Sequence, residues 1–304
     1  MSILSNPFFF APAAGGYTPT TKGIFAYGNS GSVTNLSNLV SSSGVVAADT
    51  AGVGTAEQTR TAATYGIDKA FFWGGQYSNV TNLVSNSGVV ASDSTGSGTA
   101  RYAAGATTYG VDTAIIGYGQ RSGASTNLSN LVSSSGVVAA DTAGVGQARI
   151  NIAGVAYGED KGIFGYGNTG NATTHFSMTN LVSNSGVIAT DVTGVGQARG
   201  YLAACTYGDD KAIFGYGVSL SWSGYSMTNL VSNSGVVATD VTGVGTARYN
   251  LAACGYGSDK GIFGFGDGNK SMTNLVSNSG VVASDTSGVG TGRSGLSAAG
   301  YSIT

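Results

Sequence analysis

The chain has 304 residues, only 9% of them charged, and a formal net charge of −2, so it lacks the basic surface on which nucleic-acid binding depends. Glycine contributes 51 residues and proline 3, without a Gly-X-Y period, which excludes collagen and favours turn-rich β structure. No apolar run approaches the roughly 20 residues that span a bilayer. We therefore expect no membrane span, and the low charge predicts no nucleic-acid partner.

Residues 1–20 differ in composition from the rest and are predicted to be an extended N-terminal anchor or linker. They contain Phe8, Phe9 and Phe10 in succession, followed by APAAGG. The segment lacks the basic start of a secretory signal peptide, and Asn6 and Pro7 interrupt its short apolar patch. Because an exposed apolar patch normally meets a partner, the three phenylalanines either pack under the domain or dock into another protein.

From residue 21 onward the chain repeats itself. A glycine-marked phrase typical of a buried strand occurs at residues 22–28, 69–75, 113–119, 161–167, 211–217 and 260–266. A second phrase, S-x-S-G, has its glycine at Gly44, Gly88, Gly136, Gly186, Gly235 and Gly280, in steps of 44, 48, 50, 49 and 45 residues. Repeats of about 40 to 50 residues with several strands are typical of propeller blades.

Residues 199–248 show how one repeat is built. They predict a first strand up to Gly208, a tight turn, and a second strand over residues 211–217. After a variable loop, residues 227–235 predict a third strand with a turn, and residues 236–241 predict a β-branched fourth strand. Four short antiparallel strands in one repeat form the meander of a propeller blade.

The two ends of the repeat region are incomplete in complementary ways. The first copy has no first strand before residues 22–28, whereas residues 291–302 match a first strand with nothing after it. If these segments pair, the ring closes without an exposed sheet edge. The sequence therefore predicts an all-β fold, a six-bladed β-propeller of four-stranded antiparallel blades over residues 21–304, closed by the C-terminal first strand against the N-terminal second strand.

The order of these parts resembles the kelch family of β-propellers. Arg199 precedes a small-residue first strand, a glycine-marked second strand follows, and a Gly-rich link leads to the next arginine. The Gly- and Ser-rich, charge-poor composition of the repeats also resembles that of propeller repeats in predicted virion proteins of tailed bacteriophages. This resemblance implies a non-catalytic structural or binding module of a virion, such as a tail, fibre or head-decoration protein, assembled in the host cytoplasm.

In that role, residues 1–20 would contact other virion proteins, and the propeller would attach to a host glycan or envelope protein. The alternative is a soluble, secreted or extracellular, lectin-like propeller that binds carbohydrate or protein.

Most charged residues recur at fixed positions of the repeat, including the arginines Arg101, Arg149, Arg199, Arg248 and Arg293. Two hypotheses explain these arginines. They either donate to carbonyl or carboxylate groups between blades, or form a ring around the axis that grips an anionic ligand. Glu57 takes the arginine position in one repeat, as an ion-pair defect or as the marker of an asymmetric site, and Arg60 nearby could compensate.

Enzyme motifs are absent from the sequence. A copper centre of the galactose-oxidase kind needs several histidines, and His175 is the only one. Cys205 and Cys254 share one small-residue core position in neighbouring repeats, so no disulfide is expected. We therefore expect no catalysis, no metal and no cofactor.

The loops between second and third strands vary most, with intervening lengths of 9, 6, 10, 12, 11 and 7 residues. In equivalent blades they lie on one face, which is where repeat proteins usually keep recognition. The candidate binding residues in these loops are Tyr77, Arg121, His175, Phe176, Trp222, Tyr225, Asp267 and Lys270. The aromatic members either offer flat contact area to a ligand or fold down to cover blade edges.

Overall fold

The computed structural model describes residues 18–76, 78–170 and 173–304. This part of the chain is all-β, with no helix, and its strands form several small antiparallel sheets. The all-β prediction is therefore confirmed. Tyr77, Phe8, Phe9 and Phe10 lie outside the described residues.

Six of the sheets have three or four strands, and in each the second strand lies at or next to the centre. The sheets are β21 (Ser297–Tyr301), β1 (Lys22–Ala26) and β2 (Ser37–Val40); β3 (Thr61–Tyr65), β4 (Lys69–Trp73), β5 (Val80–Val84) and β6 (Ser94–Thr95); β7 (Gly105–Tyr109), β8 (Thr113–Gly117) and β11 (Ser129–Val132); β12 (Ala153–Tyr157), β13 (Lys161–Gly165) and β14 (Thr179–Val182); β15 (Ala203–Tyr207), β16 (Lys211–Gly215) and β17 (Thr228–Val231); and β18 (Ala252–Tyr256), β19 (Lys260–Gly266) and β20 (Lys270–Val276). A separate two-stranded ribbon pairs β9 (Gln120–Arg121) with β10 (Ala124–Ser125).

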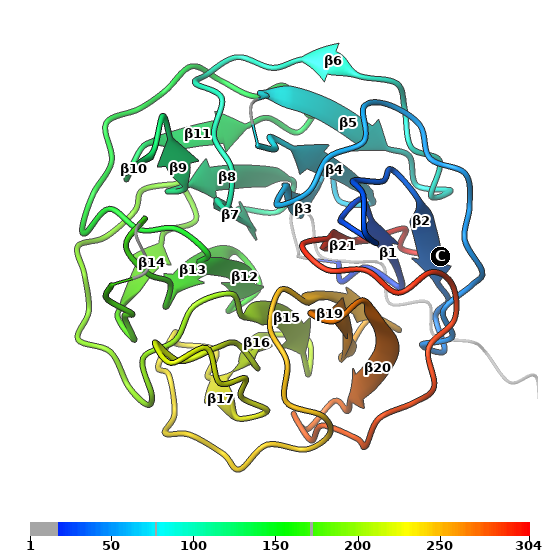
Figure 1. Ribbon diagram of the computed structural model, residues 1–304. Coiled ribbons are helices and arrows are strands. Elements are labelled where there is room, and N and C mark those ends of the chain that lie inside the picture. The colour runs from blue at the N-terminus through cyan, green and yellow to red at the C-terminus, as the bar shows by residue number, and fades with distance from the viewer. Residues whose placement is uncertain (1–17, 77, 171–172) are drawn as a thin grey trace, which may run out of the picture.

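Figure 1 shows the six sheets side by side around a central axis, each with its first strand innermost. Each innermost strand contacts the next one around the axis, in the order β21, β3, β7, β12, β15, β18 and back to β21. The packing between sheets is therefore a closed circuit, although no strand ladder runs from one sheet to the next.

The circuit depends on pairing between the two ends of the described chain. Strand β1 pairs antiparallel with β21, with Ile24 opposite Ala299 and Ala26 opposite Ser297. Thr21 continues this ladder, since its N–H donates to the carbonyl of Ser302 at 2.8 Å. The pairing predicted from the incomplete end repeats is thus confirmed.

The strand sequences follow from this packing. A second strand such as β1 is buried on both faces because neighbouring sheets cover it on both sides, so it is nearly continuously apolar. A first strand such as β15 alternates buried and half-buried residues, which is the pattern of a strand with one face in the core.

Neighbouring sheets also match each other in side-chain size. The Cys254 thiol of one sheet fills the space left by Gly23 of the next, and the thiol of Cys205 fills that left by Gly261. Where the first-strand residue is smaller, as at Ala63, the facing position is Ala114 in the same core cluster. Glycine in the second strand is therefore a space-making residue that accommodates a larger neighbour.

The predicted fourth strand forms in only one of the described sheets, where β6 pairs with β5. In the other five the corresponding segment makes isolated bridges, such as those of Val40 with Val46 and Ser37 with Thr50. Between these two bridges the fourth segment has one residue more than β2, which is a β-bulge.

The side chain of Asn38 fills this bulge. Its Nδ2 donates to the carbonyl of Ala47 at 3.0 Å and to Oδ1 of Asp49 at 2.9 Å. The prediction of four-stranded sheets is wrong in five of six cases, because the bulge leaves only isolated bridges there. The Asn82 amide fills the same bulge beside β6, where a further pair, Val80 with Thr95, extends the bridge at Thr81 into a short ladder.

The turns between first and second strands lie together at one end of the axis, and we name this end the hairpin face. Six backbone hydrogen bonds of 2.7–2.8 Å run around it from each turn to the next. Their donors and acceptors are Gly66 to Asp112, Gly110 to Asp160, Gly158 to Asp210, Gly208 to Asp259, Gly257 to Thr21, and Ser302 to Asp68. In five sheets one turn supplies both the donor and the acceptor. In the sixth, Thr21 supplies the acceptor and Ser302 the donor.

Candidate binding surface around the axis

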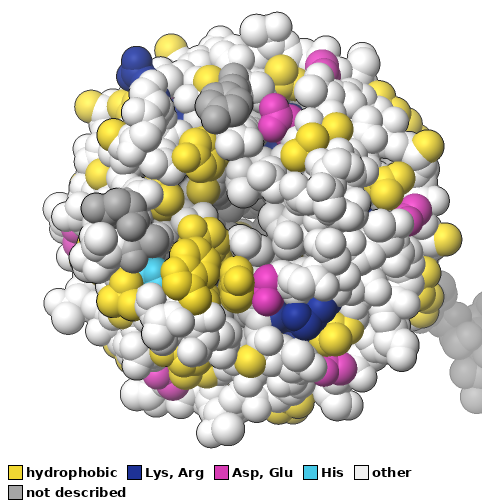
Figure 2. All heavy atoms as spheres, viewed as in Figure 1, with side chains coloured by type: hydrophobic (Ala, Val, Ile, Leu, Met, Phe, Trp, Pro, Cys, Tyr) yellow, Lys and Arg dark blue, Asp and Glu magenta, His cyan; other side chains and the backbone are white. Residues whose placement is uncertain are grey.

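The variable segments between second and third strands lie at the opposite end of the axis, and we name this end the loop face. Their described residues are 27–36, 74–76, 78–79, 118–128, 166–170, 173–178, 216–227 and 267–269. Each second strand runs from the hairpin face to the loop face (Figure 1). The segments that follow these strands therefore lie together on one face, as the sequence predicts. Figure 2 views this face, with the single histidine visible beside a group of hydrophobic side chains.

A belt of six backbone hydrogen bonds surrounds the axis at the loop face. Each member donates its N–H to the carbonyl of the preceding member, at 2.7–3.2 Å, and the last bond closes on the first. In ring order the members are Thr59, Ala103, Asn151, Tyr201, Asn250 and Gly295. All six have φ between 52° and 62°. The belt holds the mouth of the axis rigidly and fixes which side chains surround it.

Three aromatic side chains form a cluster on this face. Trp222 contacts Tyr201 with ring centroids 5.5 Å apart and Tyr249 at 5.8 Å, and the two tyrosine rings are 6.2 Å apart. Trp222 remains 52% exposed. We name these three residues the aromatic cluster. Figure 2 shows hydrophobic side chains gathered beside the central hollow of this face.

Amide side chains adjoin the aromatic cluster. Asn151 donates from Nδ2 to Oδ1 of Asn168 at 2.9 Å, and both amides lie beside Tyr201. Asn168 is fully buried, and its Nδ2 has no hydrogen-bond partner among the described residues. Burial raises the pKa of Tyr201, so its hydroxyl keeps its proton at neutral pH and can both donate and accept.

The charged residues near the cluster are already paired. Oδ1 of Asp267 accepts the Tyr249 N–H at 2.8 Å, and Nζ of Lys270 donates to the Asp267 carbonyl at 2.7 Å. His175 is half-buried, and burial lowers its pKa below the ordinary value near 6.5. The imidazole is therefore neutral at pH values above 6.5. The neighbourhood of the aromatic cluster is therefore polar but close to neutral.

The structure separates the predicted loop residues into two groups. Trp222 is exposed in the aromatic cluster and Arg121 is exposed in β9, whereas Lys270 is tied to Asp267. Phe176 and Tyr225 are half-buried, and their carbonyls accept the N–H groups of Arg199 and Arg248 at 3.3 and 3.2 Å. The partial burial of these two aromatics agrees with the alternative in which they cover blade edges.

Tyr201, Tyr249, Asn151 and Asn250 were missed by the sequence analysis because they precede first strands and do not lie in the variable loops. A signal for them does exist. They occupy the two positions after the repeated arginines, where the other copies carry residues such as Ala103, Ser294 and Gly295. Variation among otherwise similar repeats indicates candidate binding positions here, just as variation in length does for the loops.

The repeated arginines do not form a ligand-gripping ring around the axis. The five predicted arginines, 0–1% exposed, lie between neighbouring sheets. Arg199 donates from Nε to the Tyr216 carbonyl at 2.8 Å and from Nη2 to Oδ1 of Asn229 at 2.7 Å. Its guanidinium lies 4.2 Å from the ring centre of Tyr166 in the preceding sheet. The hypothesis of an anion-binding ring is wrong because the guanidinium donors are directed at groups inside these joints.

Burial lowers the pKa of Arg101 and Arg293 to about 10, and Asp141 and Asp49 respectively oppose that shift. Both arginines therefore remain charged at neutral pH. Each is a buried cation held by an aromatic face, an amide and a carboxylate, and it links two sheets.

The repeat that carries Glu57 has a different joint. The Glu57 backbone occupies the arginine position, since its carbonyl accepts the Gly28 N–H at 2.9 Å, but its carboxylate accepts the N–H of Gln76. Arg60 takes over the aromatic contact, 4.3 Å from the ring centre of Tyr27. It does not reach the amide, because Nε and Nη1 of Arg60 and Oδ1 of Asn82 all lack partners among the described residues. Glu57 therefore marks a weakened joint in the core.

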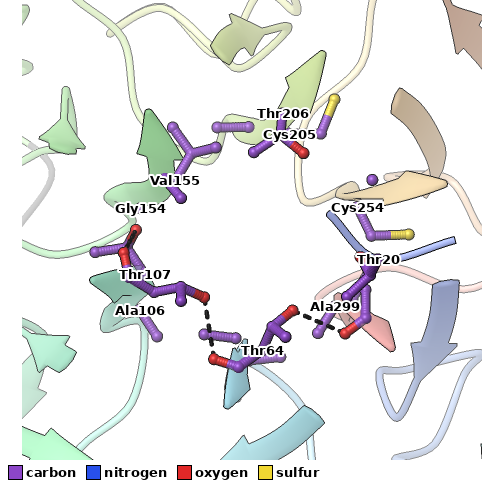
Figure 3. Close-up of a pocket in the computed structure, with 18 of the residues that line it drawn as sticks. Thr20, Thr64, Ala106, Thr107, Gly154, Val155, Cys205, Thr206, Cys254 and Ala299 are labelled. Atoms are coloured by element: carbon purple, nitrogen blue, oxygen red, sulfur yellow. Dashed lines mark hydrogen bonds between the residues drawn. The ribbon is translucent and has the colours of Figure 1, made fainter. Parts of the chain in front are cut away.

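The centre of the ring contains a cavity of about 80 Å³ towards the hairpin face (Figure 3). Threonine side chains brace its wall, with Oγ1 of Thr64 donating to the Gly300 carbonyl at 2.8 Å and Oγ1 of Thr108 to the Thr64 carbonyl at 3.0 Å. Thr18 and Thr20 line it as well.

Cys205 and Cys254 also border this cavity, but both are free and their sulfur atoms pack against glycines of the next sheets. Burial raises the pKa of the Cys254 thiol to about 12 and that of Cys205 well above its ordinary value. As thiolates are the reactive form, these cysteines act as small core residues.

Among the residues that the structure describes, no three His, Cys, Asp or Glu side chains are grouped so that they could hold a metal ion. The same residues include no helix with the length and apolar character needed to cross a membrane.

The fold and this surface together define an all-β repeat protein whose irregular residues gather around one end of its axis. No protein-family model matches the chain, and no curated protein matches its sequence.

Proposed function

We propose that residues 21–304 form a six-bladed β-propeller that serves as a non-catalytic attachment module, binding a surface ligand through its loop face. The closed circuit of innermost strands and the two closed belts of backbone hydrogen bonds support the propeller. The kelch-like order of strands is a matter of resemblance alone.

One observation carries the functional proposal, namely that the two faces differ. At the hairpin face the repeats are nearly alike, and Asp–Lys pairs such as Asp160 with Lys161 and Asp210 with Lys211 recur at 2.7 Å. At the loop face the repeats diverge, and the exposed aromatic cluster has no counterpart in the other repeats of the described chain. Divergence on a conserved scaffold is where repeat proteins place recognition.

The path of the chain supports the same division of labour. The described chain enters the ring at the hairpin face, where Thr20 and Thr21 accept backbone N–H groups of Ser258 and Gly257. The ring is thus entered opposite the loop face, which suits a module that binds its ligand through the loop face.

The virion setting, with residues 1–20 contacting other virion proteins and a bacterial envelope as the target, is proposed on the sequence resemblance. A soluble lectin-like protein would use the same loop face without needing the N-terminal segment.

A binding experiment tests the proposal. The full chain, immobilised through a biotin at its N-terminus, is exposed to envelope fragments from a panel of bacterial strains. We expect saturable binding to some strains, lost in the loop-face variant Trp222→Ala combined with Tyr249→Ala and Lys270→Glu. The hairpin-face variant Lys161→Glu with Lys211→Glu is the matched control and is expected to bind normally. Loss in the hairpin-face variant alone, or no binding to any strain, would overturn the proposal.

A further inference from the structure

We infer that the aromatic cluster of Tyr201, Trp222 and Tyr249 is a subsite for one uncharged pyranose ring of a glycan, stacked on the indole of Trp222. This inference rests on the proposed function and names the ligand class of the same face.

The first argument is the free aromatic surface. The rings of Tyr201 and Tyr249 meet the indole of Trp222 at 46° and 62°, so neither lies parallel to the indole and covers its face. The indole is nevertheless fixed from two sides and still 52% exposed. A rigid aromatic face that carries partial negative charge attracts the C–H bonds on one side of a pyranose ring.

The second argument is backbone strain at this place. Trp222 has φ of 59°, a left-handed conformation that costs residues other than glycine roughly 1–2 kcal/mol, and it lies outside the belt of hydrogen bonds that imposes such φ values on Tyr201 and its equivalents. The Trp222 N–H donates to the Ser219 carbonyl at 3.0 Å, and Oγ of Ser219 accepts the Ser223 N–H at 3.1 Å, so a short serine-rich turn holds the conformation. A bulky residue kept where glycine or asparagine would be easier indicates that its side chain is used.

The third argument is the set of polar groups beside the indole. The half-buried amide of Asn151 and the hydroxyl of Tyr201 lie together, and the fully buried amide of Asn168 supports them from below. Amide and phenol groups both donate and accept, which suits the hydroxyl groups of a sugar.

The fourth argument is the lack of free charge, which separates uncharged from acidic sugars. Asp267 already accepts the Tyr249 N–H and lies 3.7 Å from Nζ of Lys270, and His175 is neutral at pH 7. Among the residues that the structure describes, a carboxylated sugar would meet no unpaired cation at the cluster, so an uncharged hexose or N-acetylhexosamine fits it better.

Intrinsic fluorescence of the full chain provides the test, because the protein has two tryptophans and Trp73 is fully buried. The probes are the methyl pyranosides of glucose, galactose, mannose and N-acetylglucosamine, with methyl glucuronide as the acidic comparison. We expect a saturable change with at least one uncharged probe. Trp222→Ala is expected to weaken its binding at least about tenfold when measured by calorimetry, and Asn151→Ala is expected to weaken it too.

Trp73→Phe is the matched control, because the Trp73 ring packs against Arg101 inside a joint, as the ring of Phe265 packs against Arg293, and this variant should preserve the fluorescence change. If the immobilised protein binds envelope fragments but no pyranoside binds, or Trp222→Ala binds as well as the parent, the sugar subsite is wrong while the attachment function stands. Tighter binding of the glucuronide would also overturn the inference. If neither fragments nor sugars bind, both proposals fail.

Discussion

Arg293 donates from Nη2 to Oδ1 of Asn38 at 2.6 Å, although 255 residues separate them in the chain. Arg199 makes the same contact with Asn229 at 2.7 Å across only 30 residues. The joint that closes the ring is therefore built like the joints within the chain, and the arginine–asparagine pair is the unit that sets how neighbouring sheets meet.

Removing one of these arginines should destabilise the whole domain. Arg199→Met leaves Oδ1 of Asn229 and the Tyr216 carbonyl buried without their donors, so we expect a loss of roughly 3–5 kcal/mol in the free energy of unfolding. Urea denaturation measures it. Arg121→Met, at an exposed position, is the control and should change stability by less than about 0.5 kcal/mol. Equal stability of the two variants would mean that the joint contributes little.

The weakened joint at Glu57 can be repaired. Glu57→Arg combined with Arg60→Leu restores the pattern of the other joints, in which an arginine reaches the amide of the sheet and leucine follows three positions later, as Arg199 and Leu202 do. Because Oδ1 of Asn82 gains its donor, we expect an increase of about 1–3 kcal/mol in unfolding free energy. Thermal unfolding checks it, with Glu57→Arg alone as the comparison that leaves two arginines competing for one place.

The size matching between sheets predicts a coupled pair of substitutions. Gly23→Ala should destabilise by roughly 1–3 kcal/mol, since a methyl group there would overlap the sulfur of Cys254. Cys254→Ala removes the clash, so the double variant should be more stable than Gly23→Ala alone, in the manner of the native Ala63 and Ala114 pair. Additive losses in a double-mutant cycle would contradict the size matching.

The aspartates between sheets should make stability depend on acid pH. Burial alone raises the pKa of Asp141, but hydrogen bonds from Thr99 and Asn130 and the charge of Arg101 outweigh it, so the net pKa lies below the ordinary value. Asp49, Asp93 and Asp285 are lowered for similar reasons.

A folded-state pKa below the unfolded value means that the stabilisation is complete above about pH 4 and is lost as pH falls through the folded-state pKa. We therefore expect the contribution of these aspartates to the free energy of unfolding to stay constant from about pH 4 to neutral pH. Below about pH 4 it should fall steadily. Asp141→Asn should be less stable at neutral pH and lose less on acidification. A parallel acid profile for parent and variant would rule out a contribution of Asp141.

Truncation tests the closure of the ring. A chain ending at residue 290 lacks β21 and Arg293, so β1 loses one of its two partners and Asn38 its donor. We expect such a chain not to fold cooperatively, as circular dichroism on heating would reveal. A chain shortened only by Ile303 and Thr304 keeps β21 intact and should unfold nearly as the full chain does.

The repeats allowed much of this architecture to be predicted from the sequence. The incomplete ends at residues 22–28 and 291–302 were sufficient to predict the pairing of β1 with β21. The fourth strand was not predicted correctly, because the bulge that breaks its pairing arises from contacts across the sheet, which the residue pattern does not show.

The binding surface was predicted only in part, for the same kind of reason. Trp222 stands out in the sequence as an unusual residue in a variable loop. Its contact Tyr201 stands at the start of the same repeat and Tyr249 at the start of the next, and only the packing of neighbouring sheets brings the three rings together.

The hydroxyl of Thr21 donates to the carbonyl of Thr304 at 3.0 Å, so the first and last residues of the ring touch. A short bridge between them, with the chain cut instead in one of the Gly-rich links such as residues 242–247, would give a circular permutant with the same sheets in the same order. The order in which the repeats are synthesised is thus independent of the shape they build, and the ring could be opened at any of its links to display a terminus at a chosen point on its edge.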